Sequence, residues 1–596
     1  MSATIWNPND NYLAQSNATG TVKQEAQVAT AAQVSFILTT FSFVANTGSL
    51  FVYKNGSILT RGADYTEVSN TGITLAVAAT AGDKFLFIGF VGITGLSVLD
   101  TVLRAELSTS GGAGILGFSH ANIYAAGSVG SKLKKIVHVT DAPYSAIGGG
   151  VIDDTAAIQA ALNSGATRVV IPAGFTFGVT GLVLVAGQTL QLDGVLKKLS
   201  GVNATISVAS NCKVIGNGEI NGNSIVCNGI VGSNTQNVRV QGLYLRNING
   251  VGIASYSVGS NTWDILDNRI ETTTNEAIVV EYTDNCLIAN NRIKTGLHGI
   301  RWWGGDSNVS TTVGIRALRI IGNTVSGVMG GIWGSLGANI TVTGNYVDTC
   351  SDVGIDFEGC SDFTCSGNTA YECANGCYAV FYGCSQGTFS GNVARNTVSN
   401  GAAFYATTNL IYTNTNLLIV NNVFATKTAC ISATSNDNRS FSNSDIRGNQ
   451  LLCTGGQSAI SIFRNRNLRI SDNHILTLNS ATGIKLTGVN FSIVSNNTIT
   501  GNNDTSVSPV AAGGILFVSQ SAAYPCGYNS VCDNRIDSHV YSITDNSAAD
   551  LTQSQNNIRR NAVSNVYRSV GAAYNGVILD NFNFNAPGTA VAATTF

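Results

Sequence analysis

The chain is poor in charged residues and lacks the usual signals of several protein classes. Asp, Glu, Lys and Arg make up 11% of its 596 residues, and its formal net charge is −2. This balance does not suit a phosphate-binding surface, so we expect no nucleic-acid partner. No apolar run approaches the length of a membrane span, so we expect no membrane insertion. Residues 1–8 show no basic region followed by an apolar stretch, so we expect no secretory signal.

The sequence also lacks paired cysteines. It has 13 Cys, an odd number, and no Cys-x-x-Cys spacing occurs, which argues against a zinc site. Cys350 and Cys373 each follow a repeated Asn by five residues, and Cys360 and Cys384 each stand in a Gly-Cys-Ser phrase. This recurrence predicts reduced cysteines, stacked as small apolar residues inside a solenoid. No metal site and no cofactor is predicted.

A short phrase built around Asn is present in abundance. It occurs twelve times between residues 266 and 563, most often at steps of 22 to 24 residues, and longer steps of 27 to 37 indicate loop insertions. A second phrase, Gly or Ala followed by Ile, usually comes 8 to 10 residues later. Two or three short strands per repeat predict an all-β parallel β-helix, with the Asn phrase at a bend of each coil. The repeated residues are Asn268, Asn291, Asn323, Asn345, Asn368, Asn392, Asn422, Asn449, Asn473, Asn497, Asn534 and Asn561.

The remaining segments predict a division into domains. Residues 1–105 show no repeat, and their hairpin at 51–59, with Asn-Gly as a type I′ turn, and strand at 84–90 indicate a small β-rich domain. Residues 106–140 are predicted to form a linker or neck. We expect a β-helix domain over 141–565 and a short tail over 566–596. The β-helix domain should have an end-capping helix near 153–163, with Asp154 or Thr155 as the N-cap residue.

Several of these segments resemble a known family. The Asp-Asp-Thr-Ala-Ala-Ile-Gln-Ala-Ala helix at 153–161, the Ile-Pro-Ala-Gly at 171–174 and the Asn phrases resemble the pectate-lyase-like right-handed β-helix superfamily. The region from Tyr53 to Tyr65 resembles the virion-attachment domains of phage tail fibres and tailspikes. Together these features resemble a bacteriophage tailspike depolymerase.

The resemblance implies a homotrimer that binds and cleaves bacterial capsular or O-antigen polysaccharide. It implies attachment to the phage tail, or to another tail fibre, through the N-terminal domain. It also implies a virion protein that is assembled in the host cytoplasm and acts at the bacterial cell surface, which would account for the missing signal.

Alternation along the strands predicts an exposed ridge. If the Ile of each Gly-Ile phrase points inward, the next residue and the one two further point outward. Coils about 4.8 Å apart would align these residues into a ridge roughly 40 Å long. The outward pairs are predicted to be Ala254 and Tyr256, Val279 and Glu281, Arg301 and Trp303, Trp333 and Ser335, Asp356 and Glu358, Val380 and Tyr382, Ala403 and Tyr405, Ser432 and Thr434, and Ser461 and Phe463.

The composition of the ridge suits a glycan, because rings stack on sugar faces and polar groups bind hydroxyls. A trimer interface would also bury large aromatics, but the three carboxylates on the ridge argue against an interface core. The candidate substrate-binding residues are Arg301, Trp303, Trp333, Tyr256, Tyr382 and Tyr405.

Two carboxylates on one strand are the first catalytic candidates. Asp356 and Glu358 are predicted on one side of a strand with Cα atoms about 6.6 Å apart, compatible with either a retaining or an inverting glycosidase. Glu281, about 14 Å away by coil spacing, would bind sugar or act with a carboxylate of a neighbouring chain. Asp306 begins a long insertion and would either reach over the groove or form a turn.

Three functions remain open from the sequence. The favoured one is an endo-acting glycosidase that uses the carboxylate pair. The second is a polysaccharide lyase, in which Arg301 neutralises a uronate and Tyr382 or Tyr405 acts as base and acid. The third is a receptor-binding spike without enzymatic activity.

Overall fold

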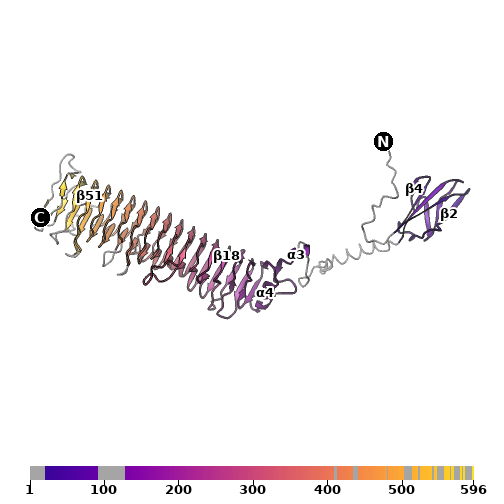
Figure 1. The fold of residues 1–596 in the computed structure, drawn as a ribbon, viewed down its shortest axis with the longest axis horizontal. Helices are drawn as coiled ribbons and strands as arrows, with labels where there is room; N and C mark the ends of the chain where they lie inside the picture. Colours follow the sequence, from indigo (N-terminus) through magenta and orange to yellow (C-terminus); the bar gives the residue numbers. More distant parts are fainter. Residues whose placement is uncertain are drawn as a thin grey trace. The chain divides into compact units, whose positions relative to one another are not determined.

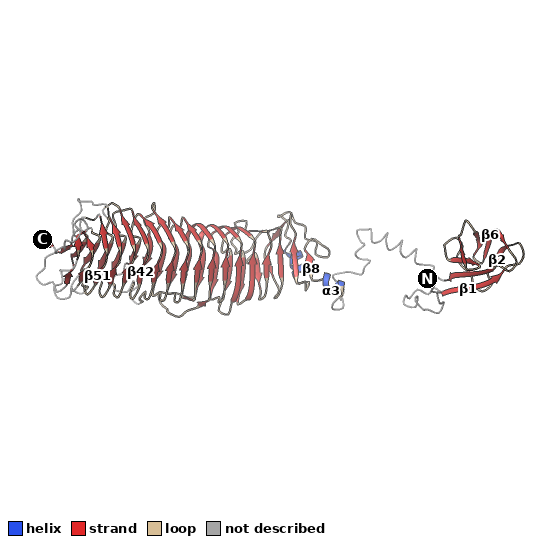
Figure 2. Ribbon diagram, turned by 90° about the horizontal axis from the view of Figure 1, so that it is seen from above, coloured by secondary structure: helices blue, strands red, loops and turns tan. Residues whose placement is uncertain are grey.

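The chain divides into two compact units, Met1–Gly130 and Ser131–Phe596, and each is described by itself. None of the helices described is long and apolar enough to cross a membrane. Figure 1 follows the chain through both units, and Figure 2 distinguishes strands from helices. The computed structural model describes residues 21–91, 128–408, 412–433, 441–479, 481–501, 513–520, 524–537, 539, 542–546, 556–563, 566–568, 577–579, 581–583 and 594–595.

The first unit contains two small antiparallel sheets, with strand orders β1-β7-β3-β4 and β2-β6-β5. Asn55 and Gly56 have φ values of 50° and 84°, so a two-residue turn of left-handed residues joins β3 to β4. The predicted hairpin and the predicted strand at 84–90 are therefore confirmed. The strands are β1 (Thr21–Val28), β2 (Gln33–Ile37), β3 (Leu50–Lys54), β4 (Ser57–Leu59), β5 (Tyr65–Ser69), β6 (Gly72–Ala79) and β7 (Lys84–Val91).

Helix α3 (Val129–Leu133) includes the boundary between the units, and helix α4 (Thr155–Leu162) belongs to the second unit. Helix α4 confirms the helix predicted near 153–163, and it buries Ile158 on its inner face. Asp154 stands at the N-cap position but makes no side-chain capping hydrogen bond. Its carboxylate instead accepts hydrogen bonds from the backbone N–H groups of Ile147 (2.8 Å) and Gly148 (3.2 Å). Asp154 therefore holds the predicted N-cap position, but the preceding loop occupies the carboxylate that would have capped the helix.

The rest of the unit is a parallel β-solenoid of about 15 turns. Each coil contributes a strand to each of three parallel rows, and the strands of successive coils lie side by side (Figures 1 and 2). The first row contains β8 (Ile136–His138), β9 (Arg168–Ile171), β12 (Thr189–Leu192), β15 (Lys213–Ile215), β18 (Gln236–Gln241), β21 (Asn261–Leu266), β24 (Leu287–Ala289), β27 (Arg319–Ile321), β30 (Thr341–Thr343), β33 (Thr364–Ser366), β36 (Thr388–Ser390), β39 (Leu418–Val420), β42 (Asp445–Arg447), β45 (Arg469–Ser471), β48 (Ile493–Ser495), β51 (Ser530–Cys532), β54 (Asn557–Arg559) and β57 (Val577–Leu579).

The other two rows contain the strands that come after the Asn bend in each coil. The second row contains β10 (Thr176–Val179), β13 (Val195–Lys198), β16 (Glu219–Asn221), β19 (Tyr244–Ile248), β22 (Arg269–Thr273), β31 (Tyr346–Asp348), β34 (Thr369–Tyr371), β37 (Val393–Asn396), β40 (Val423–Thr426), β43 (Gln450–Cys453), β46 (His474–Thr477), β49 (Thr498–Thr500), β52 (Arg535–Asp537), β55 (Ala562–Val563) and β58 (Phe582–Asn583). The third row contains β11 (Leu182–Val183), β14 (Ile206–Val208), β17 (Ile230–Ser233), β20 (Ile253–Tyr256), β23 (Glu276–Glu281), β32 (Val353–Glu358), β35 (Gly376–Phe381), β38 (Ala402–Ala406), β41 (Ile431–Ala433), β44 (Ile460–Phe463), β47 (Ile484–Thr487), β50 (Ile515–Val518), β53 (Ile543–Asn546), β56 (Val566–Arg568) and β59 (Thr594–Thr595). Strands β25 (Arg292–Trp303) and β28 (Thr324–Ser335) run through both rows, and β26 (Ile315–Arg316) pairs with β29 (Gly337–Ala338).

The repeated Asn residues form a continuous buried ladder at the bend between the first and second rows. The backbone N–H and the side-chain Nδ2 of Asn345 both donate to Oδ1 of Asn368, at 2.9 and 3.0 Å, and Nδ2 also donates to the Ile320 carbonyl. Asn368 makes the same pair of bonds to Asn392. The pattern continues to Asn581, one coil beyond the twelve predicted repeats. Buried amides at this position satisfy the backbone at each bend, which explains the Asn.

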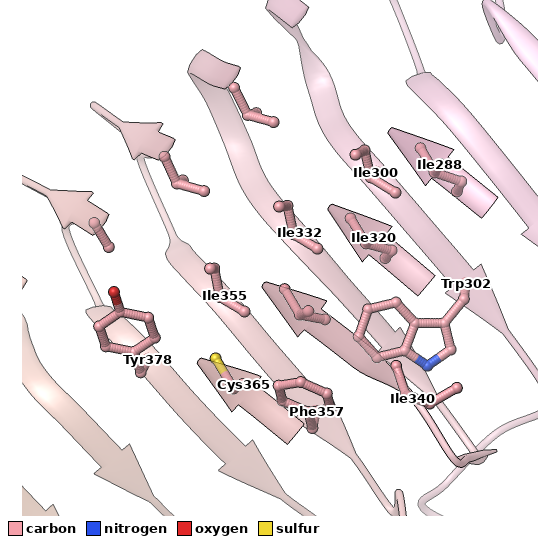
Figure 3. Close-up of a cluster of buried hydrophobic side chains, with 14 of the residues drawn as sticks. Ile288, Ile300, Trp302, Ile320, Ile332, Ile340, Ile355, Phe357, Cys365 and Tyr378 are labelled. Carbon is pink, nitrogen blue, oxygen red and sulfur yellow. The ribbon is translucent and has the colours of Figure 1, made fainter. Parts of the chain in front are cut away.

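The interior confirms the inward position of the Gly-Ile phrase. Ile300, Ile332 and Ile355 are in register on neighbouring coils and are fully buried, and Tyr378 continues their column (Figure 3). Trp302 lies two residues after Ile300 and is also fully buried. All 13 cysteines are free and 12 of them are buried, so their predicted burial is confirmed for all except Cys532, which is partly exposed.

Candidate active site

Strands of the third row place the predicted carboxylates and aromatics in two outward columns. Arg301, Trp333 and Asp356 are in register across β25, β28 and β32. Trp303 and Glu358 lie in the second column, with Ser335 between them. The side chains between these columns point inward, because alternation sends successive residues to opposite faces of a strand. The predicted alignment of these three coils is therefore confirmed.

A pocket of about 240 Å³ opens beside these columns. It contains three of the ten candidate site residues, namely Trp333, Asp356 and Glu358. Asp356 is 8% exposed, and its Oδ1 is buried without a hydrogen-bond partner among the described residues. The lining residues are His298, Met329, Gly330, Trp333, Asp352, Val353, Asp356 and Glu358.

The two carboxyl groups resist ionisation. Burial raises the pKa of Asp356 well above its ordinary value, and the negative charges of Glu358 and Asp352 add to this. Burial also raises the pKa of Glu358, to about 7, with the charges of Asp306 and Asp352 acting in the same direction and Ser307 and Arg301 opposing them. A pair of this kind holds a proton near neutral pH, which is the requirement for general acid catalysis by a carboxyl group.

The insertion after β25 packs against the site. Ser307 Oγ donates to Glu358 Oε2 at 3.4 Å, and Ser335 Oγ donates to the Gly305 carbonyl at 2.6 Å. Asp306 is exposed, and its Oδ1 accepts a hydrogen bond from the Asn308 backbone N–H at 2.9 Å. This contact is the turn-forming arrangement of an Asp. Asp306 therefore forms a turn near the pair, and its charge still acts on Glu358.

Arg301 is paired with carboxylates on the neighbouring coil. Its Nη1 lies 3.1 Å from Glu276 Oε1 and 3.6 Å from Glu281 Oε1. Its guanidinium carbon lies 4.8 Å from the ring centroid of Trp303 and 5.4 Å from that of Trp333. Arg301 thus joins the predicted Glu281 and the two tryptophans into one cluster at the edge of the pocket.

Sequence reasoning assigned no role to Glu276 or His298. His298 Nδ1 lies 3.4 Å from Glu276 Oε1, and the two residues are in register on β23 and β25. Burial disfavours the charge of Glu276, but the hydrogen bond with His298, together with Arg301, lowers its pKa to about 2. Burial, with the Glu276 charge, raises the pKa of Glu281, while Arg301 opposes the rise. The only signal for Glu276 and His298 in the sequence is that each lies two residues before an inward Ile.

Tyr256 lies on the same side but packs on apolar neighbours. Ala254 and Val279 are on the outer face as predicted, yet they are buried with Val251, and Tyr256 packs against this cluster. Burial and the charges of Glu281 and Glu276 raise the pKa of Tyr256 to about 12. Tyr256 therefore adjoins the Arg301 cluster and does not line the pocket.

Beyond Asp356 the predicted alignment is wrong by one residue on β35 and by two on β38, whereas Ser432 and Ser461 lie in the first outward column as predicted. Asp356 is in register with Ala379 and Tyr405, and Glu358 with Phe381, whereas Val380 and Ala403 are fully buried. These coils lack a Gly-Ile phrase, and the aromatic residues Tyr378 and Phe404 take the inward column instead. Tyr382 lies at a turn with φ of 56°, and Thr434 lies outside the described residues.

The rings of Tyr382 and Tyr405 both lie close to the ring of Phe381. The Phe381 ring centroid is 5.8 Å from that of Tyr382 and 5.7 Å from that of Tyr405. Burial and the charges of Glu358 and Asp356 raise the pKa of Tyr382. The three rings form an aromatic surface on the coils that follow the carboxylates. Within the described part of the chain, no group of three or more His, Cys, Asp or Glu side chains is arranged to hold a metal ion.

The chain is similar to known β-helix proteins. Residues 256–424 match the family model described as right handed beta helix region, so the predicted right-handed parallel β-helix is confirmed. A tail spike protein of Salmonella phage epsilon15 is 47% identical over 57 residues, which is 10% of this chain and 5% of that protein. The chain therefore matches only a small part of that relative.

Two solved tailspike structures are also similar. A tailspike double mutant of E. coli bacteriophage HK620, in complex with a pentasaccharide, has a TM-score of 0.50 at 13% identity, covering 74% of this chain and 84% of that chain. The Dettilon tailspike protein has a TM-score of 0.31 at 16% identity, covering 83% of this chain and 73% of that one. At these identities the similarity concerns the fold alone.

Proposed function

We propose that this protein is a phage tailspike that binds a bacterial capsular or O-antigen polysaccharide and hydrolyses it within the chain. One observation carries the proposal: Asp356 and Glu358 face one pocket, side by side on β32, next to Trp333. The similarity to tailspike proteins supports the choice of ligand class. The aromatic residues on both sides of the pair suit sugar faces along a polymer.

In the proposed reaction, Asp356 is the proton donor. Its burial raises its pKa well above the ordinary value and favours the protonated form, which can protonate the leaving glycosidic oxygen. Glu358, with a pKa of about 7, ionises first and acts on the anomeric carbon, either directly or through a water. Glu281 and Arg301, which lie three and two coils before the pair, have a binding role beside Trp303.

Two observations favour hydrolysis over β-elimination. Arg301, the candidate for neutralising a uronate, already pairs with Glu276 and Glu281. Tyr382, a candidate base, has a raised pKa because it is partly buried near two carboxyl groups. Only the deprotonated phenolate can abstract a proton, and a raised pKa leaves less of it at neutral pH.

The assembly is part of the proposal. We infer a homotrimer and an N-terminal unit that attaches the protein to the virion tail or to another tail fibre, as the tailspike resemblance implies. The ridge residues would then remain open to polysaccharide at the bacterial surface.

Substitution of the carboxyl pair tests the reaction. Purified protein is incubated with a panel of capsular and O-antigen polysaccharides, and chain length, new reducing ends and absorbance near 235 nm are followed. We expect wild-type protein to shorten at least one polymer and release reducing ends without absorbance at 235 nm. Asp356→Asn and Glu358→Gln should each abolish cleavage but keep binding.

The matched control is Asp445→Asn, a partly exposed carboxylate on the first row. It should retain full activity. Full activity in both pair variants contradicts the assignment, and absorbance at 235 nm indicates elimination. If the wild-type protein leaves every polymer intact, a spike without enzymatic activity is the better description.

A further inference from the structure

The pocket beside the carboxyl pair has one apolar wall. Met329 and Val353 line it together with the Trp333 ring, and Met329 is 37% exposed. A Cβ at Gly330 would lie 2.9 Å from His298 Cδ2 and 3.3 Å from Trp333 Cδ1, so both rings pack closely on the glycine backbone. The pocket beside this wall, with a volume of about 240 Å³, is large enough for a small group such as a methyl.

The remaining walls are acidic. Asp352, Asp356 and Glu358 all contribute to the lining, whereas the only potentially cationic lining residue is His298. His298 is held by Glu276, and Arg301 next to it is held by Glu276 and Glu281. An anionic sugar would meet carboxylates without a free counter-charge among the described residues, which disfavours a uronate or sialic acid.

Two polar atoms of the lining residues have no partner. Trp333 Nε1 and Asp356 Oδ1 are both buried without a hydrogen bond among the described residues. Buried polar atoms are normally satisfied, so an unpaired donor and an unpaired carboxyl oxygen at one pocket indicate a bound group. An indole N–H can only donate, so its partner must be an acceptor.

We propose that this pocket receives an uncharged, N-acetylated sugar residue of the polysaccharide. The acetamido carbonyl accepts from Trp333 Nε1, its N–H donates to a carboxylate of the pocket, and its methyl packs on Met329 and Val353. The inference rests on the proposed function only in taking a polysaccharide as the ligand. It names which residue of the polymer the pocket selects.

Binding of simple glycosides to the full-length protein tests this. The probes are the methyl glycosides of N-acetylglucosamine, N-acetylgalactosamine and N-acetylmannosamine, each with its parent hexose, and methyl glucuronide. Saturation-transfer NMR and titration report the contact and the affinity. We expect at least one acetamido glycoside to bind about 10-fold or more tightly than its hexose, with its acetyl methyl most strongly saturated, because an apolar group in a fitted pocket contributes this much. The glucuronide should bind more weakly than both.

Two variants locate the contact. Met329→Ala should weaken binding of the acetamido glycoside about 10-fold without changing binding of the parent hexose. Trp333→Phe should also weaken binding of the acetamido glycoside, because it removes the N–H donor. The control is Leu297→Ala, an exposed apolar residue of β25 outside the pocket, which should change nothing.

The inference is overturned if no acetamido glycoside binds, or if each binds no more tightly than its parent hexose. It is also overturned if the glucuronide binds more tightly than the acetamido glycosides, or if both variants bind as the wild type does. Cleavage of a polysaccharide without acetamido sugars also contradicts it and leaves the proposed hydrolysis standing. If the protein binds acetamido glycosides but cleaves no polymer, the inference stands and the proposed hydrolysis is contradicted.

Discussion

Two glutamates of the third row, three coils apart, have opposite electrostatic environments. Glu276 accepts from His298 and Arg301, and its pKa falls to about 2, although burial opposes the charge. Glu358 is buried near Asp306 and Asp352, and its pKa rises to about 7. The Glu276 carboxylate stabilises the ridge through its contacts with His298 and Arg301. The Glu358 carboxyl group, in contrast, titrates near neutral pH at the pocket. Substitution to Gln should therefore affect stability with opposite signs.

Glu276→Gln should destabilise the protein. A lowered folded-state pKa gives a stabilisation that is present above the unfolded pKa of about 4.3 and is lost as pH falls towards 2. At pH 8 the variant should lose about 2 kcal/mol of unfolding free energy, because Arg301 is left with a weaker partner. The loss should shrink in denaturant unfolding below pH 4, and equal losses at both pH values would contradict the assignment.

Glu358→Gln should stabilise the protein at alkaline pH. A raised pKa means that ionisation costs folding free energy, and the cost grows between about pH 4.3 and 7. Above pH 7 the variant should gain roughly 3–4 kcal/mol relative to wild type, because each pKa unit corresponds to about 1.4 kcal/mol, and at pH 4 the two should be equal. A variant that is less stable at pH 8 would show that Glu358 makes a structural contact that outweighs its burial.

The loop residues next to Glu358 should move the pH dependence of cleavage in opposite directions. If ionised Glu358 is required, the rate should rise through about pH 7, and it should fall again where the buried Asp356 loses its proton. Asp306→Asn removes a charge that raises the pKa of Glu358 and should shift the rising limb to lower pH. Ser307→Ala removes a hydrogen bond that lowers this pKa and should shift the limb to higher pH.

The two shifts have different salt dependences. Asp306 is exposed, so its effect should decrease at high ionic strength, whereas the effect of the Ser307 hydrogen bond should not. Rate profiles at two salt concentrations separate them. Shifts of the same sign in both variants would contradict the assignment of the limb to Glu358.

At the scale of the coil, the asparagine ladder and the inward column determine where side chains point. The ladder repeats one bend in every coil from Asn268 to Asn581, so successive third-row strands begin in the same orientation. Within a strand, the residue that fills the inward column then sets all outward positions, because the side-chain period is two. Tyr378 and Phe404 fill it on the coils after Glu358, which brings Phe381 and Tyr405 to the outside.

Interrupting the asparagine ladder should lower the free energy of unfolding. Asn368→Ala leaves the backbone N–H and the side-chain Nδ2 of Asn345 without their acceptor, and the Val342 carbonyl loses a donor. Each unsatisfied buried group costs about 1–3 kcal/mol, so the variant should lose at least about 3 kcal/mol. Asn400→Ala is the control, because Asn400 is exposed on the neighbouring coil. Equal thermal unfolding of both variants would argue that the ladder is structurally dispensable.

At the scale of the molecule, the two units carry separate parts of the proposed function. The pocket, the carboxyl pair and the aromatic surfaces all belong to the unit that begins at Ser131. The first unit has its own apolar core, in which Phe36, Phe85 and Phe87 are buried. Independent cores permit each unit to fold alone.

Removal of residues 1–127 should therefore separate attachment from cleavage. The truncated protein should retain wild-type cleavage of the polysaccharide, measured by release of reducing ends, but should not become incorporated into virions. Light scattering of both forms should give the mass of a trimer. Loss of cleavage in a folded truncated protein would show that the first unit contributes to the site.

Most of the fold follows from the sequence, because a coil repeats a local pattern. The Asn phrase and the inward Ile are adjacent in sequence to the strands that they orient, so counting was enough to align Arg301, Trp333 and Asp356. The prediction of the outward residues was wrong on the strand that contains Tyr378, because this aromatic residue, and not an Ile, takes the inward position. No Gly-Ile phrase in the sequence indicates that position.

The sequence by itself thus determined the β-helix, its capping helix and the strand that holds Asp356 and Glu358, since these depend on periods of two residues and of one coil. Only the tertiary structure decided which ridge residues meet at a pocket. Glu276 with His298, Ser307 with Glu358, and the burial of Asp356 arise from contacts between coils and from a folded insertion. Such contacts depend on three-dimensional packing, which buries both glutamates and gives them charged partners of opposite sign.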